Sequence, residues 1–119
     1  ENIPDDWLIQ IFYTATGGSL KGIEANPGIK PFLEKGKAIL TTIPDFVLKK
    51  KKKRFELMAE LWLWENVLAE KVLIFGGGSV ICSNSPNKLE SFLHFDYIGP
   101  PWNAFKGLGG DGSISLTTV

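Results

Sequence analysis

Residues 54–75, with the sequence RFELMAELWLWENVLAEKVLIF, carry the strongest periodic pattern in the chain. At about 100° per residue, a set of apolar side chains three, four or seven positions apart falls on one broad arc. Its members are Leu57, Leu61, Trp64, Leu68, Val72 and Phe75. The pattern predicts a long α-helix that ends at the glycines of residues 76–78. Because its polar side is also half apolar, we expect other elements to cover this helix on more than one face.

Glu65 interrupts the apolar arc near its middle. A carboxylate that leaves water without a partner is strongly destabilising, so this position needs an explanation. One explanation is a catalytic acid or base in a cleft, alone or assisted by His94, the only histidine. The other, which we favour, is an ion pair or hydrogen bond between Glu65 and a neighbouring segment, or a kink that leaves Glu65 at the rim.

Six of the 13 basic residues stand in one uninterrupted run, so the formal net charge of zero hides a polarised chain. The run consists of Lys49, Lys50, Lys51, Lys52, Lys53 and Arg54. We favour a continuous helix from Pro44 to Phe75, with these residues as an exposed basic segment of it. The run is either a solvated helix surface or a binding site for an anionic partner, namely nucleic acid, anionic lipid or an acidic protein surface.

An aromatic and proline-rich segment follows near the C-terminal end. It contains Tyr97, Pro100, Pro101, Trp102 and Phe105. Rigid aromatic side chains in loops are typical of protein interfaces, where they bury a large area at a small entropic cost. The same residues would also serve as a lid folded over the core, and the sequence favours neither interpretation.

The remaining segments are shorter and predict a mixed fold. Residues 3–18, IPDDWLIQIFYTATGG, favour a short helix, since Pro4 and two aspartates suit a first turn and the glycine pair suits an end. This stretch resembles the helix-opening motif of SMI1/KNR4-type domains, a family that includes many toxin-immunity proteins. No function is assigned from that resemblance. Residues 31–40 and 87–95 favour short amphipathic helices, and residues 79–83 and 113–117 favour strands.

The motifs that carry enzyme chemistry are weak. Both glycine clusters, FGGGSV and GLGGDGS, lack the order of strand, glycine turn and helix that a phosphate site needs. Cys82 and His94 are the only cysteine and histidine, so we predict no metal site and no cofactor. A nucleophilic Cys82/His94 pair is conceivable. A buried cysteine acting as a small apolar residue is the interpretation that we favour.

Size and composition favour one globular domain over residues 1–119, allowing for its being part of a longer chain. With a single cysteine, no disulfide can form within the chain, which favours a reducing, cytoplasmic compartment. No apolar run approaches the roughly 18 residues of a membrane span, so we expect no transmembrane segment.

These observations predict an α+β fold, with a long central helix and two shorter helices packed on a small sheet of short strands. The favoured function is a non-enzymatic protein-interaction module, either a soluble subunit or an inhibitor- or immunity-type partner protein. A small acid/base enzyme using Glu65, and a module that binds anionic surfaces through residues 49–54, are the two other hypotheses.

Overall fold

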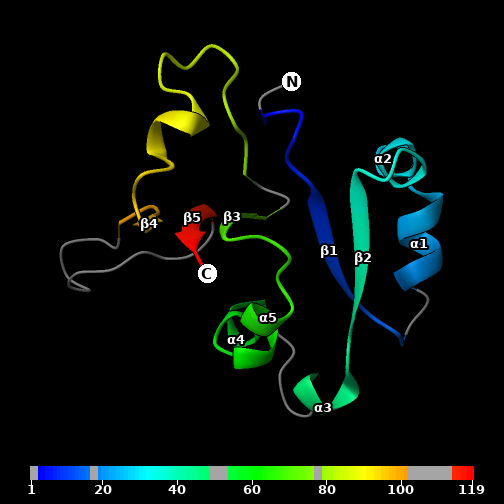
Figure 1. The fold of residues 1–119 in the computed structure, drawn as a ribbon. Coiled ribbons are helices and arrows are strands. Elements are labelled where there is room, and N and C mark those ends of the chain that lie inside the picture. Colours follow the sequence, from blue (N-terminus) through cyan, green and yellow to red (C-terminus); the bar gives the residue numbers. More distant parts are fainter. Residues whose placement is uncertain (1–2, 17–18, 49–53, 77–78, 102–113) are drawn as a thin grey trace. The chain divides into compact units, whose positions relative to one another are not determined.

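The computed structural model describes residues 3–16, 19–48, 54–76, 79–101 and 114–119. The chain divides into two compact units (Figure 1). The N-terminal unit is Asp5–Leu68, and the C-terminal unit combines Glu1–Pro4 with Ala69–Val119. Each unit has its own small sheet, and we describe the two in turn.

The sheet of the N-terminal unit is a pair of parallel strands, β1 (Ile9–Thr14) and β2 (Ala38–Ile43). Their register runs without a break from Ile9 opposite Ala38 to Thr14 opposite Ile43. Parallel neighbours need a long crossover connection, usually helical. Here the crossover consists of helices α1 (Ser19–Ala25) and α2 (Lys30–Glu34).

Helix α2 is bounded by residues that suit its two ends. Pro31 stands in its first turn, where a missing backbone N–H costs nothing. Gly36 follows the helix with φ of 67°, a left-handed conformation that glycine adopts without steric cost. The backbone N–H groups of Gly36 and Lys37 donate to Leu33 O and Phe32 O, at 3.1 and 2.8 Å. This turn sends the chain directly into β2.

Three short helices follow β2: α3 (Asp45–Leu48), α4 (Arg54–Met58) and α5 (Leu61–Glu65). The helical conformation is interrupted at Glu60, which has an extended backbone (φ −90°, ψ 129°) and precedes α5. The indole Nε1 of Trp64 donates to Met58 O at 2.9 Å, so a side chain of α5 satisfies a carbonyl at the end of α4.

Asn66 ends α5. Its side-chain Nδ2 donates to Trp62 O at 2.8 Å, and its backbone N–H donates to Leu63 O at 3.1 Å. Both bonds satisfy carbonyls in the last turn that a continuing helix would have paired with later N–H groups. The polar side chain of Asn66 therefore stabilises the helix end and not a further turn.

Gln10 links the connection after α5 to the parallel strand pair. Its Nε2 donates to Asn66 O and to Thr41 Oγ1, both at 2.8 Å. Its Oε1 accepts from Leu68 N at 3.2 Å. One amide thus holds residues 66–68 against both strands, and we call this arrangement the Gln10 clamp. Beside it, Phe12 of β1 meets Trp62 of α5 edge to face, with ring centroids 6.1 Å apart.

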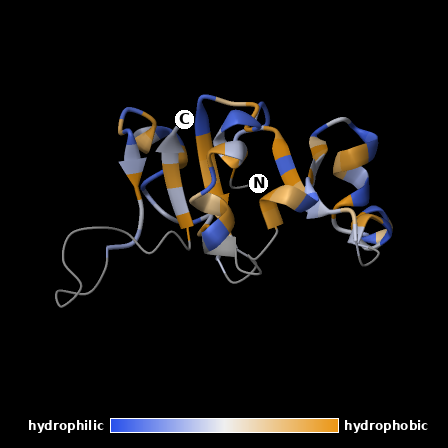
Figure 2. Cartoon of the chain, turned by 90° about the horizontal axis from the view of Figure 1, so that it is seen from below, coloured by the Kyte–Doolittle hydropathy of each residue, from blue (hydrophilic) through white to orange (hydrophobic). Residues whose placement is uncertain are grey.

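The core of the N-terminal unit is small. Its buried apolar residues are Ala38, Ile43, Val47 and Leu63, contributed by β2, α3 and α5. Figure 2 shows hydrophobic residues along the strands and hydrophilic ones in many of the connections.

The sheet of the C-terminal unit is antiparallel, with the order β3, β5, β4. Its strands are β3 (Lys71–Phe75), β4 (Tyr97–Ile98) and β5 (Ile114–Thr118), and a 3-10 helix, η1 (Leu89–Phe92), precedes β4. Leu116 of the central strand is opposite Leu73 on one side and Ile98 on the other. Leu116 is also the buried apolar residue of this unit, at 4% exposed.

The α+β class is confirmed, but the long central helix is wrong. Residues 54–75 form α4, α5 and the strand β3. The periodic signal misled because KVLIF is a short apolar run, which fits a helix face and a strand equally well, and because Asn66 ends the helix locally.

Several shorter predictions are also corrected. Residues 9–14 form β1 where a helix was predicted, because IQIFYT is rich in β-branched and aromatic residues. The predicted helix of residues 31–40 is divided between α2 and β2, and that of residues 87–95 is only the turn η1. Residues 79–83 form no strand. The predicted strand near the C-terminus is confirmed as β5.

No helix within the described ranges is both long enough and apolar enough to cross a membrane.

The Gln10 clamp makes a direct prediction. Gln10→Ala removes two donors and one acceptor, leaving Asn66 O and Leu68 N to find water, so the free energy of unfolding should fall by about 2 kcal/mol. Thr41→Val is the matched control, because it removes one partner of the amide, keeps the side-chain shape and should cost about 1 kcal/mol or less. Urea denaturation followed by Trp fluorescence measures both. Equal stability of Gln10→Ala and the wild type would contradict the role of the clamp.

Candidate functional site

An apolar hollow of about 360 Å³ lies within the C-terminal unit. Its floor is the sheet, its wall is η1, and the segment that follows β4 completes it. The residues that line it are Leu73, Leu89, Phe92, Ile98, Gly99, Pro100, Ile114, Ser115 and Leu116. Its volume exceeds the roughly 150 Å³ of an apolar cavity able to hold benzene and reaches the lower range of ligand pockets.

Strand alternation explains why this floor is apolar. Successive side chains on a strand point to opposite faces, so Ile114 and Leu116 share one face of β5. The cross-strand partners of Leu116, Leu73 and Ile98, carry their side chains on that same face. Ser115 belongs to the opposite face, and it therefore lines the hollow with its backbone. The floor offers branched apolar carbon and no charge.

The segment after β4 is held by a close approach between Tyr97 and Gly99. A Cβ atom placed on Gly99 would lie 2.5 Å from the Tyr97 hydroxyl oxygen and 3.0 Å from its ring carbon Cζ. Any larger residue at position 99 would require the exposed Tyr97 side chain to shift. Tyr97 is 50% exposed, and because its neighbour Ile98 lines the hollow, strand alternation places the tyrosine ring on the other face of β4.

A polar cluster fixes the chain that leads into β4. Lys71 Nζ donates to Phe95 O at 2.7 Å and also to Thr118 Oγ1. The Thr118 hydroxyl in turn donates to Asp96 Oδ1 at 3.3 Å, and Thr118 N donates to Asp96 O at 2.8 Å. We call Lys71, Asp96 and Thr118 the Lys71 cluster. It ties residues 95–96 to the end of β5 and so sets where β4 begins.

Sequence reasoning did not find the Lys71 cluster or the hollow. Leu73, Ile98, Ile114 and Leu116 are ordinary strand residues, and their common face appears only once the strands pair as β3, β5, β4. Lys71 falls within residues 54–75, for which the sequence predicts a helix. The alternation of Ile114 to Thr118 was the available signal, since it predicts one apolar face.

The residues predicted for acid/base chemistry are exposed and belong to different units. Glu65 is the last residue of α5, in the N-terminal unit, and it is exposed. His94 belongs to the C-terminal unit, where it is exposed and its ring stacks on Phe95 at 3.9 Å. The apolar helical arc that gave Glu65 its significance does not exist, because that helix ends at Glu65.

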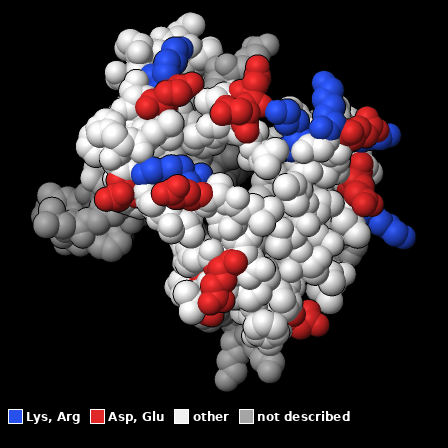
Figure 3. Space-filling model, viewed as in Figure 1, with Lys and Arg blue, Asp and Glu red and all other residues white. Residues whose placement is uncertain are grey.

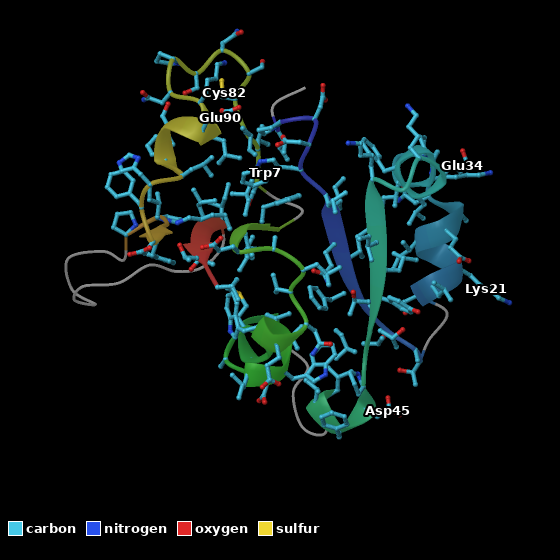
Figure 4. The ribbon with its side chains drawn as sticks, in the orientation of Figure 1. Trp7, Lys21, Glu34, Asp45, Cys82 and Glu90 are labelled. Atoms are coloured by element: carbon cyan, nitrogen blue, oxygen red, sulfur yellow. The ribbon has the colours of Figure 1, made fainter. Side chains whose placement is uncertain are left out.

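Cys82 is an exposed free cysteine on the connection between β3 and η1 (Figure 4). The interpretation of Cys82 as a buried apolar strand residue is therefore wrong. Its partner in the nucleophile hypothesis, His94, follows η1 and is exposed as well.

Of the predicted partner-binding residues, Tyr97 lies in β4 and is exposed, as an interface residue must be. Arg54 begins α4. The predicted residues Lys49, Lys50, Lys51, Lys52, Lys53, Trp102 and Phe105 lie outside the described residues.

Glu56 and the surface charges are two further candidates for a chemical site. Glu56 Oε2 of α4 is buried and has no hydrogen-bond partner. Among the described residues no group of three or more His, Cys, Asp and Glu side chains is placed to hold a metal ion, so Glu56 has no companion ligands. In Figure 3 acidic and basic side chains of the described residues are interspersed over the upper part of the visible face.

The comparison with family models gives one match, to the protein family of unknown function DUF5672, over residues 37–119. This region is more than half of the chain and contains every element from β2 to β5. The chain belongs to the DUF5672 family. The match includes the hollow and the Lys71 cluster, whereas β1 and α1 precede it. Neither the comparison with curated proteins nor that with solved structures found a match.

The Lys71 cluster is testable by a charge-free substitution. Lys71→Met keeps an unbranched stem and removes the ammonium donor, so Phe95 O and Thr118 Oγ1 lose their partner; the free energy of unfolding should fall by about 1 kcal/mol. Lys88→Met is the control, since within the described ranges Lys88 Nζ donates to Ser83 O alone, at 2.8 Å on an exposed connection. Chemical denaturation of the two variants, side by side, measures the difference. An equal decrease in the free energy of unfolding for the two variants would show that the Lys71 cluster stabilises the unit no more than a single exposed hydrogen bond does.

Proposed function

We propose that this chain is a non-enzymatic protein-interaction module, a soluble subunit or an inhibitor- or immunity-type partner protein, and that the hollow of the C-terminal unit receives an apolar side chain of its partner. The observation that carries the proposal is the hollow itself, with an apolar floor built from three strands.

The chemistry of the hollow favours an apolar anchor over a polar ligand. Small-molecule sites usually combine an apolar lining with a few polar groups that fix orientation. Here the lining side chains on the floor are hydrocarbon, and the alternation of β5 turns the Ser115 hydroxyl to the other face. A branched aliphatic or aromatic side chain matches this surface, and nothing in the floor would orient a charged substrate.

Two exposed aromatic residues, one just before β4 and one within it, suit an interface. Phe95 is 47% exposed and Tyr97 is 50% exposed, both within the segment that the Lys71 cluster holds in place. Exposed aromatic side chains on a fixed backbone are typical of the residues that dominate binding energy. Trp102 and Phe105, which the sequence predicts as contact residues, follow directly in the chain.

The energy available also points to a protein partner. Burying one large apolar side chain is worth about 1.5–3 kcal/mol. Micromolar binding requires about 8 kcal/mol. The anchor alone is therefore insufficient, and the rest must come from a wider contact around it, which a protein surface provides and a small molecule does not.

The two other hypotheses differ in their support. Binding to anionic surfaces through residues 49–54 is still motivated by six consecutive basic residues. The acid/base hypothesis has lost its motivation, because Glu65 is exposed at a helix end and not placed within an apolar helical arc. We therefore retain the first as the second candidate and do not pursue the enzyme.

The experiment fills the hollow and asks whether a partner is lost. Affinity capture from the native host lysate compares the wild type with Ile98→Trp, whose larger ring occupies the hollow, and with Ile98→Val, which leaves it open. We expect one or more proteins to be captured by the wild type and by Ile98→Val, at low and at raised salt, and to be lost by at least about tenfold with Ile98→Trp. Far-ultraviolet circular dichroism and thermal unfolding establish that each variant is folded.

Two further variants distinguish the candidate surfaces. Tyr97→Ala should weaken capture of the same proteins, because it removes an exposed aromatic side chain that the sequence predicts as a contact residue. Replacing Lys49 to Lys52 by Ser should leave that capture unchanged. Capture that is lost with the Lys replacements and at raised salt, but kept with Ile98→Trp, would overturn the proposal in favour of anionic-surface binding.

A further inference from the structure

The outer edge of β2 presents unpaired backbone groups. In a parallel pair, alternate residues of each strand point their N–H and C=O groups at the neighbour. Ile9 N donates to Lys37 O at 2.9 Å, which fixes the phase: Lys37, Ile39 and Thr41 face β1. The N–H and C=O groups of Ala38, Leu40 and Thr42 therefore point away from β1. Within the described residues none of these outward groups has a backbone partner.

The sequence of this strand carries none of the in-strand features with which proteins usually protect an exposed edge. Those features are charged side chains, proline, bulges and very short strands. The sequence of β2 is AILTTI, without charge, proline or glycine, and its register with β1 continues over six residue pairs without a bulge. The edge is most accessible in its second half, since Ala38 is buried whereas Thr42 is exposed.

The sheet also has fewer strands than such a sheet normally needs. Two strands are marginally stable alone, and parallel strands occur almost entirely in larger sheets. In the N-terminal unit the described residues supply only β1 and β2. A third strand on the β2 side would satisfy Leu40 and Thr42 and extend the ladder without disturbing any bond that the unit already makes.

We propose that the outer edge of β2 binds an extended segment of a partner protein by strand addition. Main-chain hydrogen bonds supply the affinity in this mode of recognition, and alternate side chains supply the specificity. The site goes beyond the proposed function, because it lies in the other unit, uses backbone groups in place of an apolar hollow, and stands or falls independently of whether the hollow binds anything.

The first arm of the test probes the edge with a peptide. The full chain, labelled with nitrogen-15, is titrated with an acetylated and amidated hexapeptide of alternating Thr and Val. We expect amide resonance changes at Leu40 and Thr42 that exceed those at Ile39 and Thr41. The same peptide with every backbone nitrogen methylated keeps its side chains but loses its donors, and it should not bind. The absence of any change up to millimolar peptide would overturn the proposal.

The second arm alters the edge. Leu40→Pro removes an outward N–H that the β1 ladder does not use, a position at which an edge strand tolerates proline. Leu40→Ala shortens the same side chain but keeps the N–H. Peptide binding should be at least about tenfold weaker for Leu40→Pro than for Leu40→Ala. Equal binding would overturn the proposal. So would a chain that is dimeric without peptide and already protects the Leu40 and Thr42 amides from hydrogen exchange, because the occupant would then be a second copy.

Discussion

The side-chain amide of Gln10 is the interaction that joins the strands and the helical segment of the N-terminal unit. Its two donors and its acceptor engage Thr41 of one strand and the backbone of residues 66 and 68, so a single side chain joins the strand pair to the end of the helical segment. Such a hub is effective because leaving this partly buried amide unpaired would cost free energy, which favours the observed path of residues 66–68. Since Leu68 is also the last residue of this unit, the clamp sets where the unit ends and the next sheet begins.

The sequence predicted the α+β class of the fold correctly, but not which segments form its helices and strands. The α+β class and the strand at the C-terminus followed from short β-branched alternation, which tertiary context did not override. The prediction of a long helix was wrong for a local reason. The same leucines and tryptophans fit two short helices, because the Asn66 side-chain amide donates to Trp62 O and ends the second helix. Nothing in the spacing of residues 54–75 distinguishes those outcomes. The strand β1 was missed because Pro4 and two aspartates, which suit a helix start, precede a segment whose β propensity is stronger.

The candidate site shows the same limit in another form. Tyr97 was predicted from its aromatic character and lies exposed in β4, as expected of a contact residue. The hollow depends on Leu73, Ile98 and Leu116 standing side by side across three strands from distant parts of the sequence. Such a surface is a property of pairing order, which no single segment encodes. The Lys71 cluster is likewise visible only when the ends of β3 and β5 meet the turn before β4.

The match to the family begins at residue 37, one position before β2, and so separates the two strands of the parallel pair. A polypeptide containing only the matched region would hold β2 without β1, and both sides of that strand would be bare. Its inward carbonyls and amides would then have the same need for a neighbour that Leu40 and Thr42 have in this chain. The segment before residue 37 thus supplies β1, which pairs with one edge of β2. Among the described residues the other edge of β2 has no backbone partner.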